Sequence, residues 1–209
     1  MLTIGHSNRS LGEFLDLLKA HGVDLVVDVR IIPRSRRNPQ FNRETLPHAL
    51  EAKGIGYEPM PGLGGLRHAR KDSLNTGWKN LGFRGYADYM QTAEFAQNLE
   101  SLEQLEACHR GAILCAESVP WRCHRFLIAD ALTVRGVPVA HITSINRANP
   151  TTSRGSHSWK VPESPIRVKT SNFSTTDWNP HLVRSIFTHR VRCLSPSRTL
   201  SLAIHGALD

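Results

Sequence analysis

Eleven residues near the middle of the chain concentrate the side chains that could perform chemistry. The segment CAESVPWRCHR, residues 115–125, holds two thiols, a carboxylate, an imidazole and two guanidiniums. It follows an apolar run at 112–114 and precedes residues 126–134, whose apolar side chains recur at helical spacing. In open α/β sheets, ligands bind where a strand ends and a helix begins. We therefore expect the reactive site in this loop.

The two cysteines of this loop are candidates for thiol chemistry. Loop N–H groups and Arg122 would stabilise a thiolate at Cys115 and lower its pKa, which would make it a nucleophile. The alternative is that Cys115 is a small buried residue of the core. Cys123, at the start of the predicted helix, is either a resolving thiol or a side chain packed inward.

Glu117 and two histidines could each serve either chemistry or structure. Glu117 is a general acid or base if its carboxyl is desolvated, or else an ion-pair partner of Arg122 or Arg125. His124 and His6 could converge at one sheet edge, as catalysts or as hydrogen-bonded structural groups.

A metal site built from cysteines and histidines is disfavoured by their spacing. Cys115, Cys123, His124 and His6 include no Cys-x-x-Cys or His-x-x-x-His pair, which structural and catalytic zinc sites commonly use. We therefore predict no metal, and the sequence leaves the cofactor unknown.

A second group of polar residues follows the apolar strand predicted at 25–27. A carboxylate at Asp28 is costly unless it is paired, so it would hold Arg30 or Arg125 in place. The basic loop after it, with Arg34, Arg37 and Asn38, is either an anion-binding loop or a solvated basic segment.

Further arginines and aromatic residues lie in the glycine-rich region around Arg84 and Tyr86. Guanidiniums beside aromatic rings suit a phosphorylated or nucleotide-like small molecule. The predicted catalytic residues are Cys115, Glu117, Arg122, Cys123, His124 and Asp28. The predicted substrate-binding residues are His6, Arg30, Arg34, Arg37, Asn38, Arg84 and Tyr86.

The pattern of apolar residues alternates between strand and helix periods. Strands are predicted at 2–5, 25–27, 55–57, 112–114 and 137–142. Helices are predicted after Ser10, where Glu13 completes a capping box, and at 44–53, 86–91, 93–107 and 123–134. Residues 60–85 read as a long loop. This alternation predicts one α/β domain over 1–150, three-layered, with a mostly parallel sheet and helices on both faces.

Charge and hydropathy narrow the possible partners. The chain of 209 residues has a formal net charge of +8, of which residues 151–209 supply +5, so the body is only mildly basic. Nucleic acid is thus a weakly supported partner. No stretch reaches about 18 apolar residues, and the N-terminus has no basic segment before an apolar one. We expect a soluble cytoplasmic protein without a membrane partner.

Several segments closely resemble the bacterial family called domain of unknown function 488. The segments are TIGHSNRSL, VVDVRIIPRSRRNPQF, LGG, GWKN with GFRGYADYM, and CAESVPWRCHRFLIADAL, which together span residues 1–148. The resemblance implies an intracellular α/β protein and supplies no reaction.

A weaker resemblance is to rhodanese-like domains. The helix SLGEFLDLLKAHGV, the strand closing in Asp28-Val-Arg30, and the strand ending in Cys115 occupy similar places. The usual glycine of the active loop is missing, and Pro120 lacks the N–H that such a loop would donate to its substrate. The resemblance implies a Rossmann-like or rhodanese-like fold more than it implies sulfur transfer.

Residues 151–209 depart from the family. They contain 17 serines and threonines and little periodicity, which is typical of a disordered basic tail. The family resemblance implies a different ending, of the type His-x-Leu-Thr-x-Phe-Ala followed by a short strand. Back-translated residues 151–169, read from the third base of each codon, are compatible with that ending and a stop. We therefore interpret the tail as frameshifted and expect it to be poorly ordered.

Two functions fit these observations. The first is an enzyme that acts on an anionic substrate at the Cys/Glu/Arg/His loop, with thiolate chemistry. The alternative is a non-catalytic module that binds a nucleotide or nucleic acid through its arginines. Cys115→Ser would separate the two, because it would abolish turnover in the enzyme and leave ligand binding intact in either.

Overall fold

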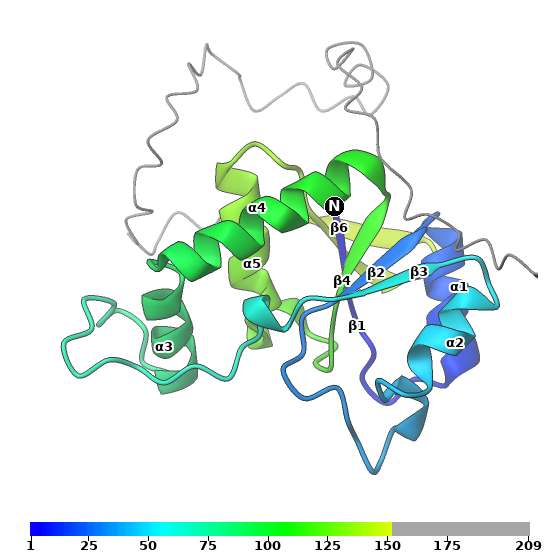
Figure 1. The fold of residues 1–209 in the computed structure, drawn as a ribbon, viewed down its shortest axis with the longest axis horizontal. Helices are drawn as coiled ribbons and strands as arrows, with labels where there is room; N and C mark the ends of the chain where they lie inside the picture. The colour runs from blue at the N-terminus through cyan, green and yellow to red at the C-terminus, as the bar shows by residue number, and fades with distance from the viewer. Residues whose placement is uncertain (152–209) are drawn as a thin grey trace, which may run out of the picture. The chain divides into compact units, whose positions relative to one another are not determined.

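A six-stranded sheet forms the centre of the protein, as the computed structural model shows for residues 1–151 (Figure 1). Residues 152–209, which include almost all of the predicted tail, lie outside the described residues. The strands are β1 (Leu2–Gly5), β2 (Leu25–Asp28), β3 (Gly56–Pro59), β4 (Gly111–Cys115), β5 (Ala140–Ser144) and β6 (Arg147–Pro150). Their order in the sheet is β3-β2-β4-β1-β5-β6, and only β6 is antiparallel to its neighbour.

The described part has five α-helices, and four of them cover the two faces of the sheet. The five helices are α1 (Leu11–Ala20), α2 (Leu46–Glu51), α3 (Leu81–Tyr89), α4 (Ala93–Cys108) and α5 (Arg125–Val134). Helices α1 and α2 lie on one side of the sheet, and α4 and α5 lie on the other (Figure 1). The predicted three-layer α/β fold is therefore confirmed. Within the described part, no helix combines the length and the apolar character needed to cross a bilayer.

Each face of the sheet has its own apolar core, because successive strand residues point in opposite directions. In β2, Val26 packs with the side chains of α1 and α2, including Phe14. Its neighbour Val27 packs with α4 and α5, including Leu102 and Ile128. Burial on both faces explains why the parallel strands are continuously apolar.

The capping box predicted at the start of α1 is present. The Ser10 hydroxyl accepts a hydrogen bond from the Glu13 backbone N–H, and the Glu13 carboxylate accepts one from the Ser10 N–H at 2.8 Å. These bonds satisfy two of the N–H groups that a helix start leaves open. Because α1 follows directly after β1, the cap also fixes the path of the loop after the strand.

Helix α3 begins earlier than the sequence predicted, inside the region interpreted as a long loop. The Asn80 side chain caps it by accepting hydrogen bonds from the N–H groups of Gly82 and Phe83. Gly85 lowers the helix propensity of this segment but has a packing role. A Cβ there would lie 2.5 Å from the carbonyl oxygen of Arg67, so the glycine lets the preceding loop lie directly on the helix.

Strand β6 was not predicted. Arg147–Pro150 has neither an alternating nor a continuous apolar pattern, and it pairs with β5 at the edge of the sheet. Proline is tolerated on an edge strand because its missing N–H would face away from the ladder. The pairing, rather than the local sequence, therefore makes this segment a strand.

Gly5, the last residue of β1, is required by the close approach of the loop after β4. A Cβ on Gly5 would overlap the carbonyl oxygen of Glu117 and lie 2.7 Å from the Arg125 guanidinium. We expect Gly5→Ala to lower the free energy of unfolding by about 1–3 kcal/mol, as overpacking of a buried site does. Chemical denaturation would measure this loss.

Gly12→Ala is the matched control, because a Cβ at this helical glycine would meet nothing within 4 Å. The control should be neutral or stabilise the protein by up to about 1 kcal/mol through helix propensity. Equal stability of the two variants would contradict the close packing of the β1 and β4 loops.

Candidate functional site

The loops that carry the predicted residues meet at one edge of the sheet. In the parallel register, Gly5 of β1 lies beside Cys115 of β4, and Asp28 of β2 lies beside Leu114. The three strands thus end together, and the chain segments that follow them face one another. This is the edge at which parallel α/β sheets bind their ligands.

Two cavities open at this edge. The first cavity has a volume of about 440 Å³ and is lined by Arg30, Ile31, Ile32, Gly65, Leu66, Asn80, Gly82, Phe83, Cys115, Ala116, Glu117, Arg122, Cys123 and His124. The second cavity has a volume of about 750 Å³ and is lined by His6, Ser7, Asn8, Arg30, Ile32, Arg34, Ser35, Arg37, Asn38, Ala116, Glu117 and Ser118. Four residues line both, so the cavities share a wall.

The first cavity contains five of the six residues predicted to be catalytic, and the second contains five of the seven predicted to bind substrate. Asp28 lies beneath the cavities, fully buried. Arg84 lines neither cavity, because its guanidinium donates to the Trp78 and Thr76 carbonyls. Tyr86 belongs to the core, where its hydroxyl donates to the Leu63 carbonyl at 2.9 Å.

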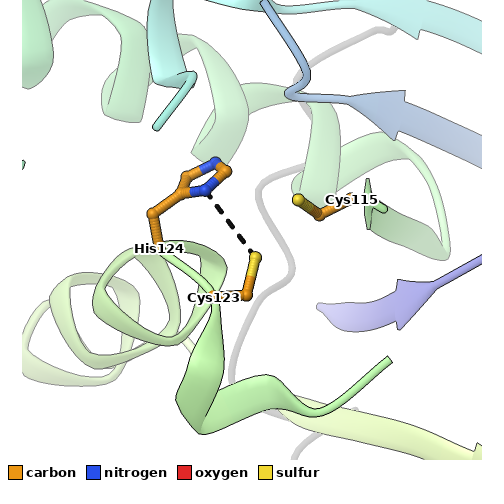
Figure 2. Close-up of side chains that lie close together, drawn as sticks. All are labelled: Cys115, Cys123 and His124. Atoms are coloured by element: carbon orange, nitrogen blue, oxygen red, sulfur yellow. Dashed lines mark hydrogen bonds between the residues drawn. The ribbon is translucent and has the colours of Figure 1, made fainter. Parts of the chain in front are cut away.

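Cys115, Cys123 and His124 form a compact cluster (Figure 2). One ligand atom from each of the three lies within 4.8 Å of the others. The Cys123 Sγ is 3.7 Å from His124 Nδ1, which is a sulfur hydrogen bond. Strand β4 positions Cys115, and the 3-10 turn Pro120–Arg122 brings the other two residues back over its end.

The pKa values of the two thiols are shifted in opposite directions. The neighbouring Cys123 S–H lowers the pKa of Cys115, assisted by the backbone N–H groups of Glu117 and Ala116 and by the Arg125 guanidinium. Burial opposes this shift. The Cys115 thiolate in turn raises the pKa of Cys123, as burial also does. These shifts favour a thiolate at Cys115 and a protonated thiol at Cys123.

Arg125 is a buried cation without a carboxylate partner among residues 1–151. Its side chain is almost fully buried, and it donates to the carbonyl oxygens of Glu117 and Ser118. Its Nε has no hydrogen-bond partner. Its sequence position suggested only an ion-pair partner, yet Arg125 shapes the loop after Cys115, and its charge lowers the pKa of that thiol.

His124 is a neutral imidazole. Burial, with the charges of Arg125 and Arg67, lowers its pKa to about 4. Its Nε2 is buried without a hydrogen-bond partner. The ring lies against the first cavity and 5.1 Å from the ring of Tyr86. The neutral ring can accept a hydrogen bond at one nitrogen and donate one at the other.

The same three residues could hold a metal ion. Two sulfurs and an imidazole nitrogen are a donor set that Zn²⁺ accepts, and three protein ligands would leave a fourth position for a substrate. The sequence disfavoured such a site because the cysteines lack the usual spacing. Folding of the loop brings them together regardless, which spacing alone could not indicate.

Asp28, Arg30 and His6 form a network under the shared wall. The Asp28 carboxylate accepts hydrogen bonds from Nε and Nη2 of Arg30 at 2.8 and 2.6 Å, and from the Tyr57 hydroxyl at 2.8 Å. Arg30 Nη1 donates to His6 Nε2 at 3.1 Å. The His6 ring is stacked on Phe41 at 4.3 Å. Asp28 therefore holds Arg30 in place, one of the two roles its position suggested.

Glu117 lines both cavities. The carboxylate accepts a hydrogen bond from the Val119 N–H at 3.1 Å, and it forms no ion pair with Arg122 or Arg125 in the described structure. The predicted ion pair between Glu117 and an arginine is therefore wrong. Arg125 instead donates a hydrogen bond to the backbone carbonyl of Glu117.

The comparison with family models decides the affiliation. Residues 10–132 match the model described as "Domain of unknown function DUF488". The chain belongs to this family. The matched region extends from the start of α1 almost to the end of α5, so it includes the Cys115 cluster and its loops. Searches of curated proteins and of solved structures found no match, and hence none to a rhodanese-like protein.

Proposed function

We propose that this DUF488 protein is an enzyme that uses the Cys115 thiolate on an anionic small molecule. The observation that carries the proposal is the electrostatic setting of Cys115 at the wall of the first cavity. A thiolate is the nucleophilic form of cysteine, and it forms where hydrogen bonds and positive charge stabilise it. Cys123, two backbone N–H groups and Arg125 provide that stabilisation.

The charge of Arg125 favours a single thiolate. A buried guanidinium costs free energy unless a negative group compensates it, and no carboxylate in the described part of the chain forms an ion pair with Arg125. A thiolate at Cys115 would neutralise the charge of the Arg125 guanidinium. Glu117, which lines the same cavity, would transfer the proton that the substrate gains or loses.

A module that only binds anions does not need a thiolate beside a carboxylate. The arginines of the second cavity suffice for binding, whereas a low-pKa thiol beside a carboxylate serves bond formation. Zinc binding by Cys115, Cys123 and His124 is the second candidate, favoured by the proximity of their ligand atoms. It would place a Lewis acid in the first cavity and leave neither thiol free.

Thiol labelling tests the proposal. In the full chain treated briefly with iodoacetamide at neutral pH, we expect Cys115 to be alkylated first, as peptide mass spectrometry would report. Cys123→Ala should slow labelling of Cys115 several-fold, because the S–H donor to the thiolate is lost. In Cys115→Ser the thiolate that raises the pKa of Cys123 is gone, but burial still raises that pKa, so Cys123 should react more slowly than Cys115 does in the wild type.

Two results would contradict the proposal. One is labelling of Cys115 no faster than that of the unfolded protein. The other is a stoichiometric metal ion, measured by elemental analysis of the purified protein, whose removal is needed before Cys115 reacts. The second result would establish the zinc alternative.

A further inference from the structure

The second cavity has features that the proposed thiol chemistry does not use. It lies on the far side of the shared wall from the cysteine cluster and is lined by arginine, asparagine, serine and histidine side chains. The guanidiniums of Arg34 and Arg37 are exposed and make no hydrogen bond or ion pair with any described residue. Unpartnered donors around a cavity point to a missing acceptor.

The inner wall of the second cavity is fixed in position. Arg30 has five N–H donors, of which Asp28 takes two, His6 one and the Phe41 carbonyl one. The remaining Nη1 N–H has no partner among the described residues. Since the Arg30 side chain is only 7% exposed, its orientation is set before any ligand arrives.

His6 and Ser7 continue this wall. His6 Nδ1 donates to the Ser7 carbonyl at 2.8 Å, so Nε2 must be the acceptor for Arg30. Ser7 has φ of 51°, and within residues 1–151 it is the one residue other than glycine with a positive φ. This conformation costs free energy and is held by the bond from the Ser7 N–H to the Ala116 carbonyl at 2.9 Å. Strain of this kind concentrates at ligand sites.

The charges around the second cavity favour an anion. Asp28 already neutralises Arg30. The remaining charges are the two positive charges of Arg34 and Arg37 and the one negative charge of Glu117, so positive charge is in excess. Glu117 lies in the shared wall rather than among the arginines of the outer loop. Guanidiniums bind phosphate oxygens through paired N–H groups, which suits a doubly charged group better than a single carboxylate.

The first cavity has a different rim. Ile32 and Leu66 are 66% and 69% exposed there, and the half-buried Phe83 ring lies beside them. Exposed apolar side chains around an otherwise polar site favour an apolar or planar ligand part. A molecule that crosses the shared wall would therefore have an anionic end and an apolar end.

We propose that the second cavity is a phosphate subsite, and that the substrate is a phosphorylated small molecule lying across both cavities. The phosphate binds Arg30, Arg34 and Arg37, and the apolar or planar remainder lies by Phe83 and Leu66, next to Cys115. This inference rests on the proposed function for the reacting end only. The phosphate subsite stands on the geometry of the second cavity.

Phosphate binding by the full chain tests the subsite. Isothermal titration with inorganic phosphate, at constant ionic strength set with chloride, should give saturable binding to the wild type. The double variant Arg34→Ala with Arg37→Ala should bind at least about tenfold more weakly. Arg36→Ala is the matched control, because Arg36 lies between them in sequence, is exposed and lines neither cavity. It should bind phosphate as the wild type does.

Phenyl phosphate tests the connection between the cavities. Its ring should slow iodoacetamide labelling of Cys115 in the wild type, and this protection should be lost in the double variant. Inorganic phosphate at the same occupancy should protect much less, because it does not reach across the shared wall.

Phosphate affinity equal in the wild type and the double variant would overturn the phosphate subsite, while fast labelling of Cys115 would still stand. Phosphate binding without protection by phenyl phosphate would overturn the bridging substrate. Slow labelling of Cys115 in all variants, with phosphate binding intact, would instead refute the thiolate proposal and leave the subsite.

Discussion

Asp28→Ala should lower the free energy of unfolding by about 3–5 kcal/mol, the usual cost of removing one partner from a buried ion pair. Asp28 is 1% exposed, and it binds two nitrogens of Arg30 and the Tyr57 hydroxyl. Without the carboxylate, the Arg30 guanidinium remains buried with two donors unsatisfied. Urea denaturation followed by circular dichroism would measure the loss. The variant should also bind phosphate more weakly, because Arg30 loses its fixed orientation.

Asp72→Ala is the matched control. Asp72 also pairs with an arginine two residues away in sequence, Arg70, but both side chains are largely exposed. Solvent screens such a pair, so its removal should leave the denaturation midpoint almost unchanged. Similar midpoints for the Asp28 and Asp72 variants would show that the Arg30 network does not stabilise the fold.

Acidification from pH 7 to pH 4 should destabilise the protein by several kcal/mol. Burial lowers the pKa of His6, His124 and His141 to about 4, against about 6.5 in the unfolded chain. Between these values the unfolded chain binds protons that the folded protein does not, so stability rises with pH over this window and is lost as pH falls. Each histidine contributes up to about 3 kcal/mol, at roughly 1.4 kcal/mol per pKa unit.

Asp130 acts in the opposite direction over part of this window, because burial raises its pKa to about 6. Because one carboxyl opposes three histidines, the free energy of unfolding still falls as the pH is lowered. Urea denaturation at pH 7 and pH 4 would measure it. His141→Gln should reduce the pH dependence, whereas His109→Gln, which changes a histidine that is 44% exposed, should not. Equal stability at both pH values would mean that these histidines are not buried neutral.

The architecture, and the sheet edge at which the candidate residues meet, could be predicted from sequence because the local signals of the elements agree. The capping box at Ser10 and Glu13 and the apolar strands each specify their own element. Parallel strands then bring their carboxyl ends to one edge, which placed Asp28 and Cys115 near each other. Where one residue type could serve packing or function, as with Tyr86, the sequence had no means to separate them.

The details of the site depend on tertiary contacts that have no local signature. Arg125 reads as a first-turn helix residue, and only the fold buries it against the Glu117 and Ser118 carbonyls. The clustering of Cys115 with His124 depends on how the loop turns at Pro120–Arg122. The early start of helix α3 and the whole of strand β6 were missed for the same reason, since packing of Gly85 and pairing at the sheet edge decide them.

The proposed chemistry depends on the ionisation of Cys115, which the pH dependence of its labelling reports. The rate of iodoacetamide labelling at Cys115 should be measured in the full chain from pH 5 to pH 9, with Arg125→Met alongside. We predict a midpoint well below about 8.5, the ordinary value for a thiol. The midpoint should move towards that value in Arg125→Met, because the buried positive charge is removed. A wild-type midpoint at or above about 8.5 would contradict a thiolate at Cys115.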